Sequence, residues 1–267
     1  MWGGRQSRGN RRAQTSRGPE RRHPATPGER RRPAPWNRLP PQNHLIELVA
    51  RADRRRLLSR CEPVDLALGQ TVCEPATATR HVYFPIDGFI SLIAVVAGSP
   101  GIEVGMVGRE GMLGSQLALG VVTSPLHAMV QGGGSALRIG KVAFRVELAQ
   151  SATLRSVLER YIAVLMAQLA TSAVCLRFHQ IGPRLARWLL MSNDRAHCDT
   201  FRITHEFLAH MLGVRRVGIT AAAGELQRRG LIEYHRGVLT VLDRGGLERA
   251  ACACYASDRR AYARQFP

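Results

Sequence analysis

The sequence predicts an α+β fold in which an antiparallel, jelly-roll-like β-roll is followed by one long helix and a C-terminal winged helix-turn-helix. Three observations predict it: short β-type segments broken by glycine after Cys61, a long apolar helical pattern from Ser151, and two short helical patterns around Gly213 that precede a hairpin pattern. The expected parts are a disordered basic tail at 1–40, the β-roll at 41–150, the long helix at 151–180, the winged helix at 181–245 and a helical tail at 246–267.

The charge of the chain is strongly positive. Its 267 residues are 45% hydrophobic, which is typical of a globular protein, yet the formal net charge is +18. Such an excess favours a polyanionic partner such as nucleic acid. Lys141 is the single lysine, so an arginine-only excess also fits a coding bias.

Residues 1–40 carry +9 of this charge, with eleven arginines against Glu20 and Glu29. They are rich in Arg, Pro and Gly and show no hydrophobic periodicity, which predicts disorder. The composition favours an extension without a role of its own, or residues upstream of the true start. A DNA-contacting arm is the alternative.

The β-roll is expected to follow a helical segment, "NHLIELVARADRRRLLSRC", in which Leu45, Leu48 and Val49, and then Leu57 and Leu58, lie at helical spacing. "HVYFPIDGFISLIAVV" reads as two strands around Asp87-Gly88, a common hairpin signal. Further strands are "GIEVGMV", "LHAMVQ" and "SALRI", with turns at 98–101 and 132–134. Together they predict an antiparallel barrel or double-sheet roll.

The long helix, "SATLRSVLERYIAVLMAQLATSAVCLRF", is apolar on nearly all sides. Such a helix needs two packing partners, here the β-roll and a second copy of the chain. The sequence thus predicts a homodimer through Leu158, Ile162, Leu165 and Leu169, with burial inside a monomer as the alternative. We find no uninterrupted run of 18 apolar residues and expect no membrane span.

A helix-turn-helix is predicted next. After a break at Gly182-Pro183 and the helix "RLARWLLMSNDRA", Thr204 is placed to cap "HEFLAHML", which ends at Gly213. On the following helix an apolar stripe faces the core: Ile219, Ala222, Ala223 and Leu226. The opposite face carries small or basic residues: Val217, Ala221, Gly224 and Arg228, flanked by Arg216 and Thr220.

This bare, basic face suits the major groove, where small side chains allow close approach and arginines reach bases and phosphates. A solvated helix with chance arginines is the alternative, but it does not explain the short helix before it or the hairpin "GLIEYHRGVLTVLD" after it. The predicted DNA-binding residues are Thr204, Arg215, Arg216, Val217, Thr220, Ala221, Arg228, His235 and Arg236, the last two at the tip of the wing.

Over roughly residues 45–255 the chain resembles the Crp/Fnr family of transcription regulators, through "HVYFPIDGFISL", "VGREGMLG", "LTVLD" and above all "THEFLAHMLGVRRVGITAAAGELQRRGLI". The resemblance implies a β-roll sensor domain, a dimerisation helix and a homodimer that reads a pseudo-palindromic operator. It puts Arg216 at a base-reading position, and Arg215 and Gly218 at phosphate contacts. Val217 and Ala221 replace the family's glutamate and second arginine, so the operator is expected to differ.

The resemblance is weaker in the sensor. "GREGMLG" stands at the cyclic-nucleotide phosphate cassette, which makes Gly108, Arg109, Glu110 and Gly111 the candidate effector pocket. "SPLHAMV" replaces the arginine-containing run that would bind a cyclic phosphate, and Arg109 is more typical of a salt bridge. Cyclic AMP is therefore not the expected effector. Haem at His81 or His127 is disfavoured, because both read as ordinary strand residues.

Other site types have little support. The six cysteines form no CxxC and Cys252-Ala253-Cys254 is too close for a standard zinc knuckle, so reduced thiols, no metal and no cofactor are expected. No P-loop, HExxH or nucleophile elbow indicates an enzyme. We expect a cytoplasmic regulator that binds double-stranded DNA and an unknown small-molecule effector, with RNA polymerase as a candidate partner. A sensor module whose main output is not transcription is the alternative.

Overall fold

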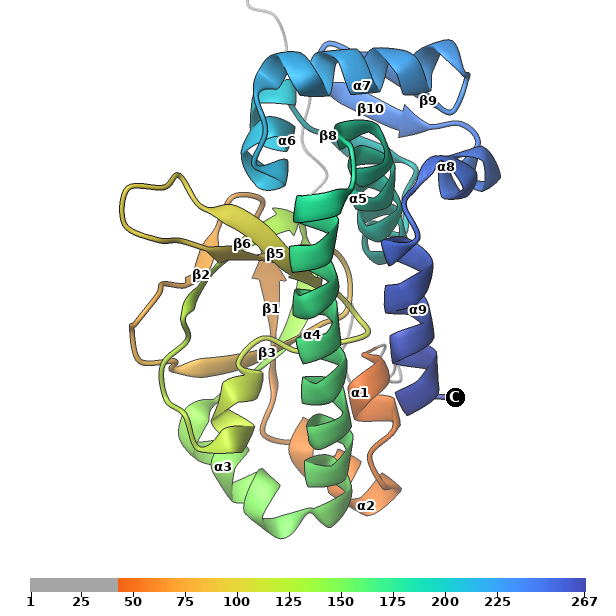
Figure 1. The fold of residues 1–267 in the computed structure, drawn as a ribbon. Helices are drawn as coiled ribbons and strands as arrows, with labels where there is room; N and C mark the ends of the chain where they lie inside the picture. Colours follow the sequence, from red (N-terminus) through yellow and green to blue (C-terminus); the bar gives the residue numbers. More distant parts are fainter. Residues whose placement is uncertain (1–42) are drawn as a thin grey trace, which may run out of the picture. The chain divides into compact units, whose positions relative to one another are not determined.

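The computed structural model describes residues 43–267, so the tail expected at residues 1–40 lies outside it (Figure 1). The predicted double-sheet roll is present, and all of its strand pairs are antiparallel. One sheet has the order β1-β7-β3, and the other has the order β2-β6-β4-β5. The bounds are β1 Glu62–Leu66, β2 Thr71–Cys73, β3 His81–Pro85, β4 Phe89–Ala94, β5 Ile102–Val107, β6 Leu126–Gly132 and β7 Gly134–Gly140.

The hairpin predicted at Asp87-Gly88 is wrong, because β3 pairs with β7 and β4 pairs with β5 and β6. The Asp87-Gly88 turn instead carries the chain from one sheet to the other, as Gly133 does between β6 and β7. Gly88 has φ +72°, and a Cβ there would overlap the carbonyl oxygen of Gly132, while a Cβ at Gly134 would overlap that of Asp87. The glycines are needed because the two crossings pass in backbone contact.

Short helices close one end of the roll. The N-terminal helical segment is split at Ala50 into α1 (His44–Glu47) and α2 (Arg51–Leu58), and α3 spans Lys141–Gln150. A 3₁₀ helix, η2, spans Ser115–Leu119. Their apolar side chains form a core with the start of the long helix, which includes Leu45, Ile46, Leu57, Phe84, Phe144, Leu154 and Leu158. Each such side chain contributes about 1.5–3 kcal/mol by leaving water.

The predicted long helix is α4 (Ala152–Phe178), and the Ser151 hydroxyl caps it by accepting from the Leu154 N–H at 3.0 Å. Contrary to our expectation, α4 is long and apolar enough to cross a membrane, judged by length and composition alone, because Arg177 is the one charge after Arg160. One face of α4 is nevertheless buried against the β-roll and against the C-terminal helix, so its composition is also that of a core helix.

The C-terminal part begins with α5 (Ile181–Ala196), which starts directly after His179 and Gln180. Gly182 and Pro183 lie in its first turn, where a proline costs no hydrogen bond, so they do not mark the break themselves. The winged helix comprises β8 (Thr200–Arg202), α6 (His205–Leu212), α7 (Arg216–Arg228), β9 (Ile232–His235) and β10 (Val238–Val241), with sheet order β8-β10-β9. Helices α8 (Arg244–Ala250) and α9 (Cys254–Gln265) follow, and α9 runs along α4 (Figure 1).

Candidate nucleic-acid interface

Local sequence signals build the helix-turn-helix as predicted. The Thr204 hydroxyl accepts from the Phe207 N–H at 3.1 Å, and Gly213 ends α6 with φ +60°, a left-handed conformation that glycine adopts without strain. Leu208, Met211 and Leu212 of α6 are buried, as are Ile219, Ala223 and Leu226 of α7, while Ala222 is half-buried. The stripe that faces the core is therefore the one that periodicity predicts.

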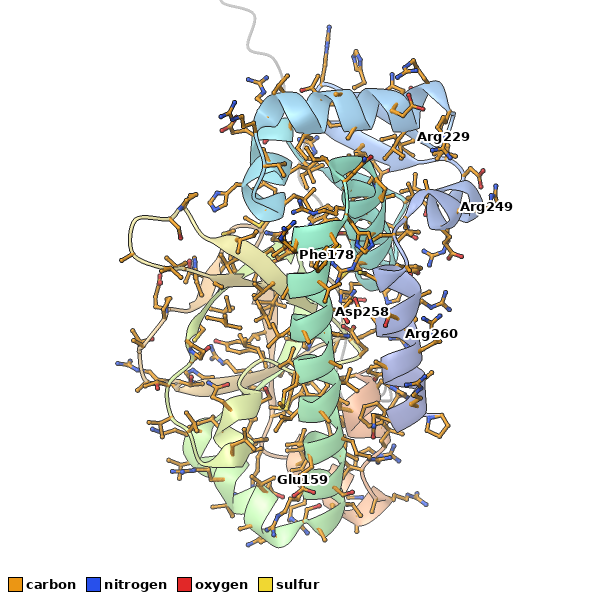
Figure 2. The ribbon with its side chains drawn as sticks, in the orientation of Figure 1. Glu159, Phe178, Arg229, Arg249, Asp258 and Arg260 are labelled. Carbon is orange, nitrogen blue, oxygen red and sulfur yellow. The ribbon has the colours of Figure 1, made fainter. Side chains whose placement is uncertain are left out.

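The opposite face of α7 is exposed along its whole length. Arg215, Arg216, Thr220, Ala221, Gly224 and Arg228 are exposed, and Val217 is 72% exposed, whereas Gly218 is half-buried beside Ile181. Figure 2 shows side chains projecting from α7 away from the rest of the chain. Within residues 43–267, no side chain caps the start of α7 at Arg215, so its first backbone N–H groups are available to an anion.

The wing is a tight hairpin. Arg236 and Gly237 both have positive φ (47° and 79°), as the preferred two-residue hairpin turn requires, and His235 and Arg236 are exposed. Tyr234 fixes the wing to the helices, because its hydroxyl donates to the Ile203 carbonyl at 3.1 Å and its N–H donates to Gln227 Oε1 at 3.0 Å. The wing tip is therefore held in a defined place beside α7.

Sequence reasoning missed His205, which joins α6, α7 and the wing. Its Nδ1 lies 3.0 Å from Thr220 Oγ1, and its ring stacks on Tyr234 with centroids 4.3 Å apart. Burial, together with the charge of Arg216, lowers the pKa of His205 below its ordinary value. Only the three-dimensional contacts identify it, since a histidine after a capping threonine is not itself a signal.

Besides Thr204, which caps α6, two of the predicted DNA-binding residues make side-chain contacts within the chain. The Thr220 hydroxyl contacts His205 and donates to the Arg216 carbonyl at 3.2 Å. Arg228 pairs with Glu225 one turn before it. Both side chains remain exposed, so these contacts orient them without removing them from the surface.

The four predicted effector residues lie at the contact between the β-roll and α5. The Glu110 carboxylate accepts from Arg195 at 2.8 Å, and a Cβ at Gly108 would meet the Arg195 side chain. Gly111 packs against the Tyr161 ring. Arg109 and Glu110 line a cavity of about 480 Å³ together with His44, Arg195 and residues of α9.

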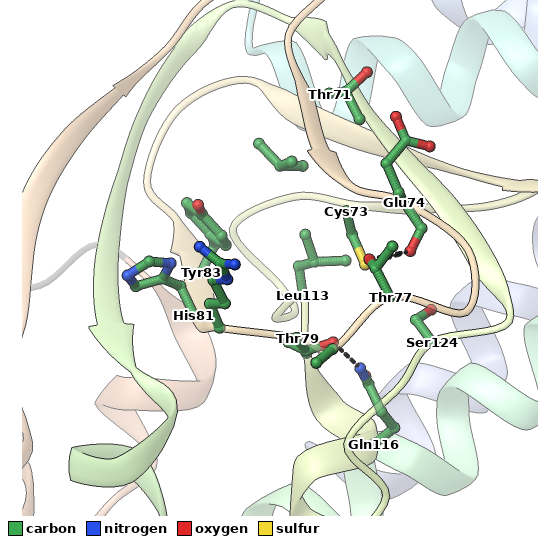
Figure 3. A pocket seen from close by; sticks show the side chains of 14 residues that line it. Thr71, Cys73, Glu74, Thr77, Thr79, His81, Tyr83, Leu113, Gln116 and Ser124 are labelled. Carbon is green, nitrogen blue, oxygen red and sulfur yellow. Dashed lines mark hydrogen bonds between the residues drawn. The ribbon is translucent and has the colours of Figure 1, made fainter.

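A separate cavity of about 400 Å³ lies in the β-roll itself, and none of the four predicted residues lines it (Figure 3). Its lining mixes apolar side chains such as Val72 and Leu113 with polar ones, which include Thr71, Glu74, Thr77, Thr79, Arg80, His81, Tyr83 and Gln116. Gln116 Nε2 donates to Thr79 Oγ1 at 2.8 Å, so part of the wall is fixed by an internal hydrogen bond. Of the two histidines weighed for haem, His81 lines this cavity and His127 contacts Thr71.

Comparisons with known proteins agree with this architecture. Residues 183–250 match the family model for the Crp-like helix-turn-helix domain. A protein from Eubacterium rectale assigned to the Crp/Fnr transcriptional regulators is similar with TM-score 0.61 and 16% identity, over 78% of this chain and 97% of its own. FixK2 from Bradyrhizobium japonicum is similar with TM-score 0.61 and 12% identity, over 72% and 98%. The c-di-GMP-responsive regulator CLP from Xanthomonas campestris is similar with TM-score 0.59 and 16% identity, over 73% and 100%. No curated protein sequence matches the chain.

Proposed function

We propose that this chain, which has the Crp/Fnr fold and carries a Crp-like helix-turn-helix domain at residues 183–250, is a cytoplasmic DNA-binding transcription regulator that acts as a homodimer. The observation that carries the proposal is the exposed face of α7. It combines arginines at its start, small residues along its length and uncapped backbone N–H groups. That combination suits a helix inserted into the major groove.

In the proposed complex Arg216 reads a guanine through its two parallel N–H donors. Arg215, Gly218 and the wing residues His235 and Arg236 contact phosphates, which position the helix without specifying sequence. Val217 and Ala221 have no side-chain donor, so they contribute only apolar contact with the bases.

Dimerisation is proposed through α4, on a stripe adjoining the residues expected from the sequence. Leu158 is fully buried in the chain's own core, and Ile162, Leu165 and Leu169 are half-buried. The exposed positions Ala163, Met166, Ala170 and Ala173 follow the alternating three- and four-residue spacing of a two-helix seam. Pairing along this stripe would present two α7 helices to half-sites about 34 Å apart, one turn of DNA.

A small-molecule input is favoured by the 400 Å³ cavity in the β-roll, which has the size of a ligand site and a lining that combines apolar surface with several polar groups. The alternative, a sensor whose main output is not transcription, leaves the exposed face of α7 without a role. RNA polymerase is the partner that an activator would require.

Selection of binding sites from random DNA by the purified full chain tests the proposal. The expected product is a two-fold symmetric motif. With Arg216→Ala, we expect one position of each half-site to be no longer sequence-specific. Arg249→Ala on α8 is the matched control, expected to select the same motif. The selection is run both without additions and with a small-molecule extract of cells as a source of effectors. If neither run enriches a motif, the proposal is wrong.

A further inference from the structure

Three cysteines and one histidine from two distant segments meet beside the end of α4. Cys175 and His179 belong to its last turn and C-cap, while Cys252 lies in the link between α8 and α9 and Cys254 is the first residue of α9. The four candidate ligand atoms, three Sγ and one imidazole nitrogen, all lie within 4.8 Å of one another. The remaining cysteines, Cys61, Cys73 and Cys198, lie outside this cluster.

Local structure aims the four side chains at one point. Cys175 and His179 are four residues apart, so they share one face of the helix end. Cys252 is held in the link because its N–H donates to the Pro183 carbonyl at 3.3 Å, and the Tyr255 N–H donates back to the Cys252 carbonyl at 3.1 Å. The close Cys252-Ala253-Cys254 pair, too short to form a knuckle on its own, needs to supply only two of the four ligands.

We infer that Cys175, His179, Cys252 and Cys254 form a Zn²⁺ site. Zn²⁺ binds sulfur at about 2.3 Å and nitrogen at about 2.0 Å, so a tetrahedral site holds two sulfurs about 3.8 Å apart and a sulfur and a nitrogen about 3.6 Å apart. Cys175 Sγ lies 3.5 Å from Cys252 Sγ, and Cys254 Sγ lies 3.5 Å from His179 Nδ1. Small shifts of these side chains would complete the tetrahedron.

The donor set and its burial favour zinc over other occupants. Three thiolates and one imidazole are a common set for structural Zn²⁺, which takes four protein ligands and no water. The three cysteines are at most 8% exposed and His179 is half-buried, so the thiol groups are shielded from water. The ligand atoms are too close together to surround an iron–sulfur cluster, whose several atoms hold their cysteines farther apart.

The charge around the cluster also suits a bound metal. Zn²⁺ with three thiolates and a neutral imidazole leaves one net negative charge in a buried place. Arg184 and Arg187 line the same small cavity as Cys175, and Arg187 is held by Asp258 at 2.7 Å. These guanidinium groups would compensate that charge.

The ligands flank the whole DNA-binding domain, because two precede residue 180 and two follow residue 251. A metal that joins them would clamp both ends of the domain to the end of α4. Its orientation relative to the proposed dimer helix would then depend on the metal, and this consequence rests on the proposed DNA binding. In that case the supply of zinc, or oxidation of the thiols, would control the binding of DNA.

Metal content of the full chain tests the site directly. The protein is purified under reducing conditions, incubated with Zn²⁺ and desalted. Its metal content is then measured by inductively coupled plasma mass spectrometry. We expect one Zn²⁺ per chain, lost in Cys254→Ser and in His179→Ala, and kept in the controls Cys61→Ser and Cys198→Ser. Replacement by Co²⁺ in the unmutated chain is expected to give the thiolate and tetrahedral absorption bands, a readout that does not depend on whether a variant folds.

Several results would overturn the site. These are a desalted chain without metal, a Co²⁺ spectrum without thiolate bands, and metal kept by both ligand variants. Peptide mapping of a Cys175–Cys252 disulfide in the freshly reduced and metal-treated protein would also contradict it.

The clamp is tested separately on a selected DNA site. Removal of metal by a chelator is expected to weaken specific binding by a factor on the order of ten, and added Zn²⁺ is expected to restore it. Binding unchanged after metal loss would overturn the clamp and leave the site standing. Absence of specific DNA binding by the zinc-loaded chain would contradict the proposed function and leave the metal count unaffected.

Discussion

Glu103 shows how a single residue couples the β-roll to the DNA-binding part. Its carboxyl group accepts from Ser91 Oγ at 2.5 Å within the roll and from Trp188 Nε1 of α5 at 2.9 Å. Burial raises the pKa of Glu103 to about 7, although the two hydrogen bonds and the nearby Arg187 and Arg195 act in the opposite direction. Burial therefore favours the protonated form of Glu103, whereas the two hydrogen bonds favour the carboxylate.

Replacement of Glu103 by glutamine is expected to change the pH dependence of stability. Because the pKa is about 7 in the folded chain against 4.5 without the fold, the stabilising contribution of Glu103 is full below pH 4.5 and is lost as the pH rises through 7. Glutamine is neutral at every pH, so it does not lose this contribution. Above pH 7 the free energy of unfolding of Glu103→Gln should therefore be higher than that of the unmutated chain, by up to about 3 kcal/mol. Urea unfolding of both proteins at several pH values measures this difference in free energy of unfolding. A difference that does not vary with pH would contradict the raised pKa of Glu103.

Arg216 is the residue on which we expect DNA sequence specificity to depend most directly. Because Arg216→Ala removes a bidentate donor, it should cost about 1–3 kcal/mol of binding and relax discrimination at one base pair per half-site. Fluorescence anisotropy with the selected site and its point variants measures this, with Arg249→Ala as the control. An equal loss on every sequence would show that Arg216 contacts phosphate instead.

Among the elements, α4 has two apolar faces with different tasks. One packs against the roll and α9 through Val157, Leu158, Tyr161 and Val164, which are buried. The other is exposed at Ala163, Met166, Ala170 and Ala173. Composition and periodicity show that both faces are apolar, but only the packing shows which one is already occupied.

Met166→Asp is expected to convert the proposed dimer to a monomer, because an unpaired carboxylate would be buried in the seam. Met166 is 66% exposed within one chain, so the change should leave the chain's own core intact. Leu165→Asp is less informative, since Leu165 also packs against the β-roll core. Analytical ultracentrifugation reports the mass. Val142→Asp, at a 74% exposed position on α3, is the control and should stay dimeric. A Met166→Asp dimer would place the interface elsewhere.

For the whole molecule, we expect the net charge of +18 to govern the first, sequence-independent contact with DNA in the proposed function. Half of that charge belongs to residues 1–40. In the proposed complex, non-specific affinity depends on the number of phosphates neutralised, whereas specificity depends on the α7 face.

Deletion of residues 1–40 is therefore expected to lower affinity for random-sequence DNA and to flatten its dependence on salt concentration, while the selected motif stays the same. Titrations at several salt concentrations give the slope. An unchanged slope would mean that these arginines do not contact DNA, and a changed motif would mean that they read bases.

The sequence predicts local elements well and distant contacts poorly. Thr204, Gly213 and the Ile219 stripe define the helix-turn-helix because their signals lie within a few residues of each other. Asp87-Gly88 has the same local chemistry whether it closes a hairpin or crosses between sheets, so the partner of β3 was not predictable. The contacts of Cys175 with Cys252 and of His205 with Tyr234 depend on how whole helices and strands pack. Residue spacing along the sequence does not predict such packing.

The topology of the roll has a consequence for synthesis of the protein on the ribosome. Among the strands that the structure describes, β1 and β3 pair with β7 alone, apart from one isolated bridge between Tyr83 and Leu113, and β7 is the last strand of the roll to be made. Since the crossings at Gly88 and Gly133 must also pass against each other, the first sheet cannot assemble while the nascent chain ends before Gly140. Its strands would leave the exit tunnel with unpaired edges, and until β7 emerges they are natural targets for a chaperone that binds extended, apolar segments.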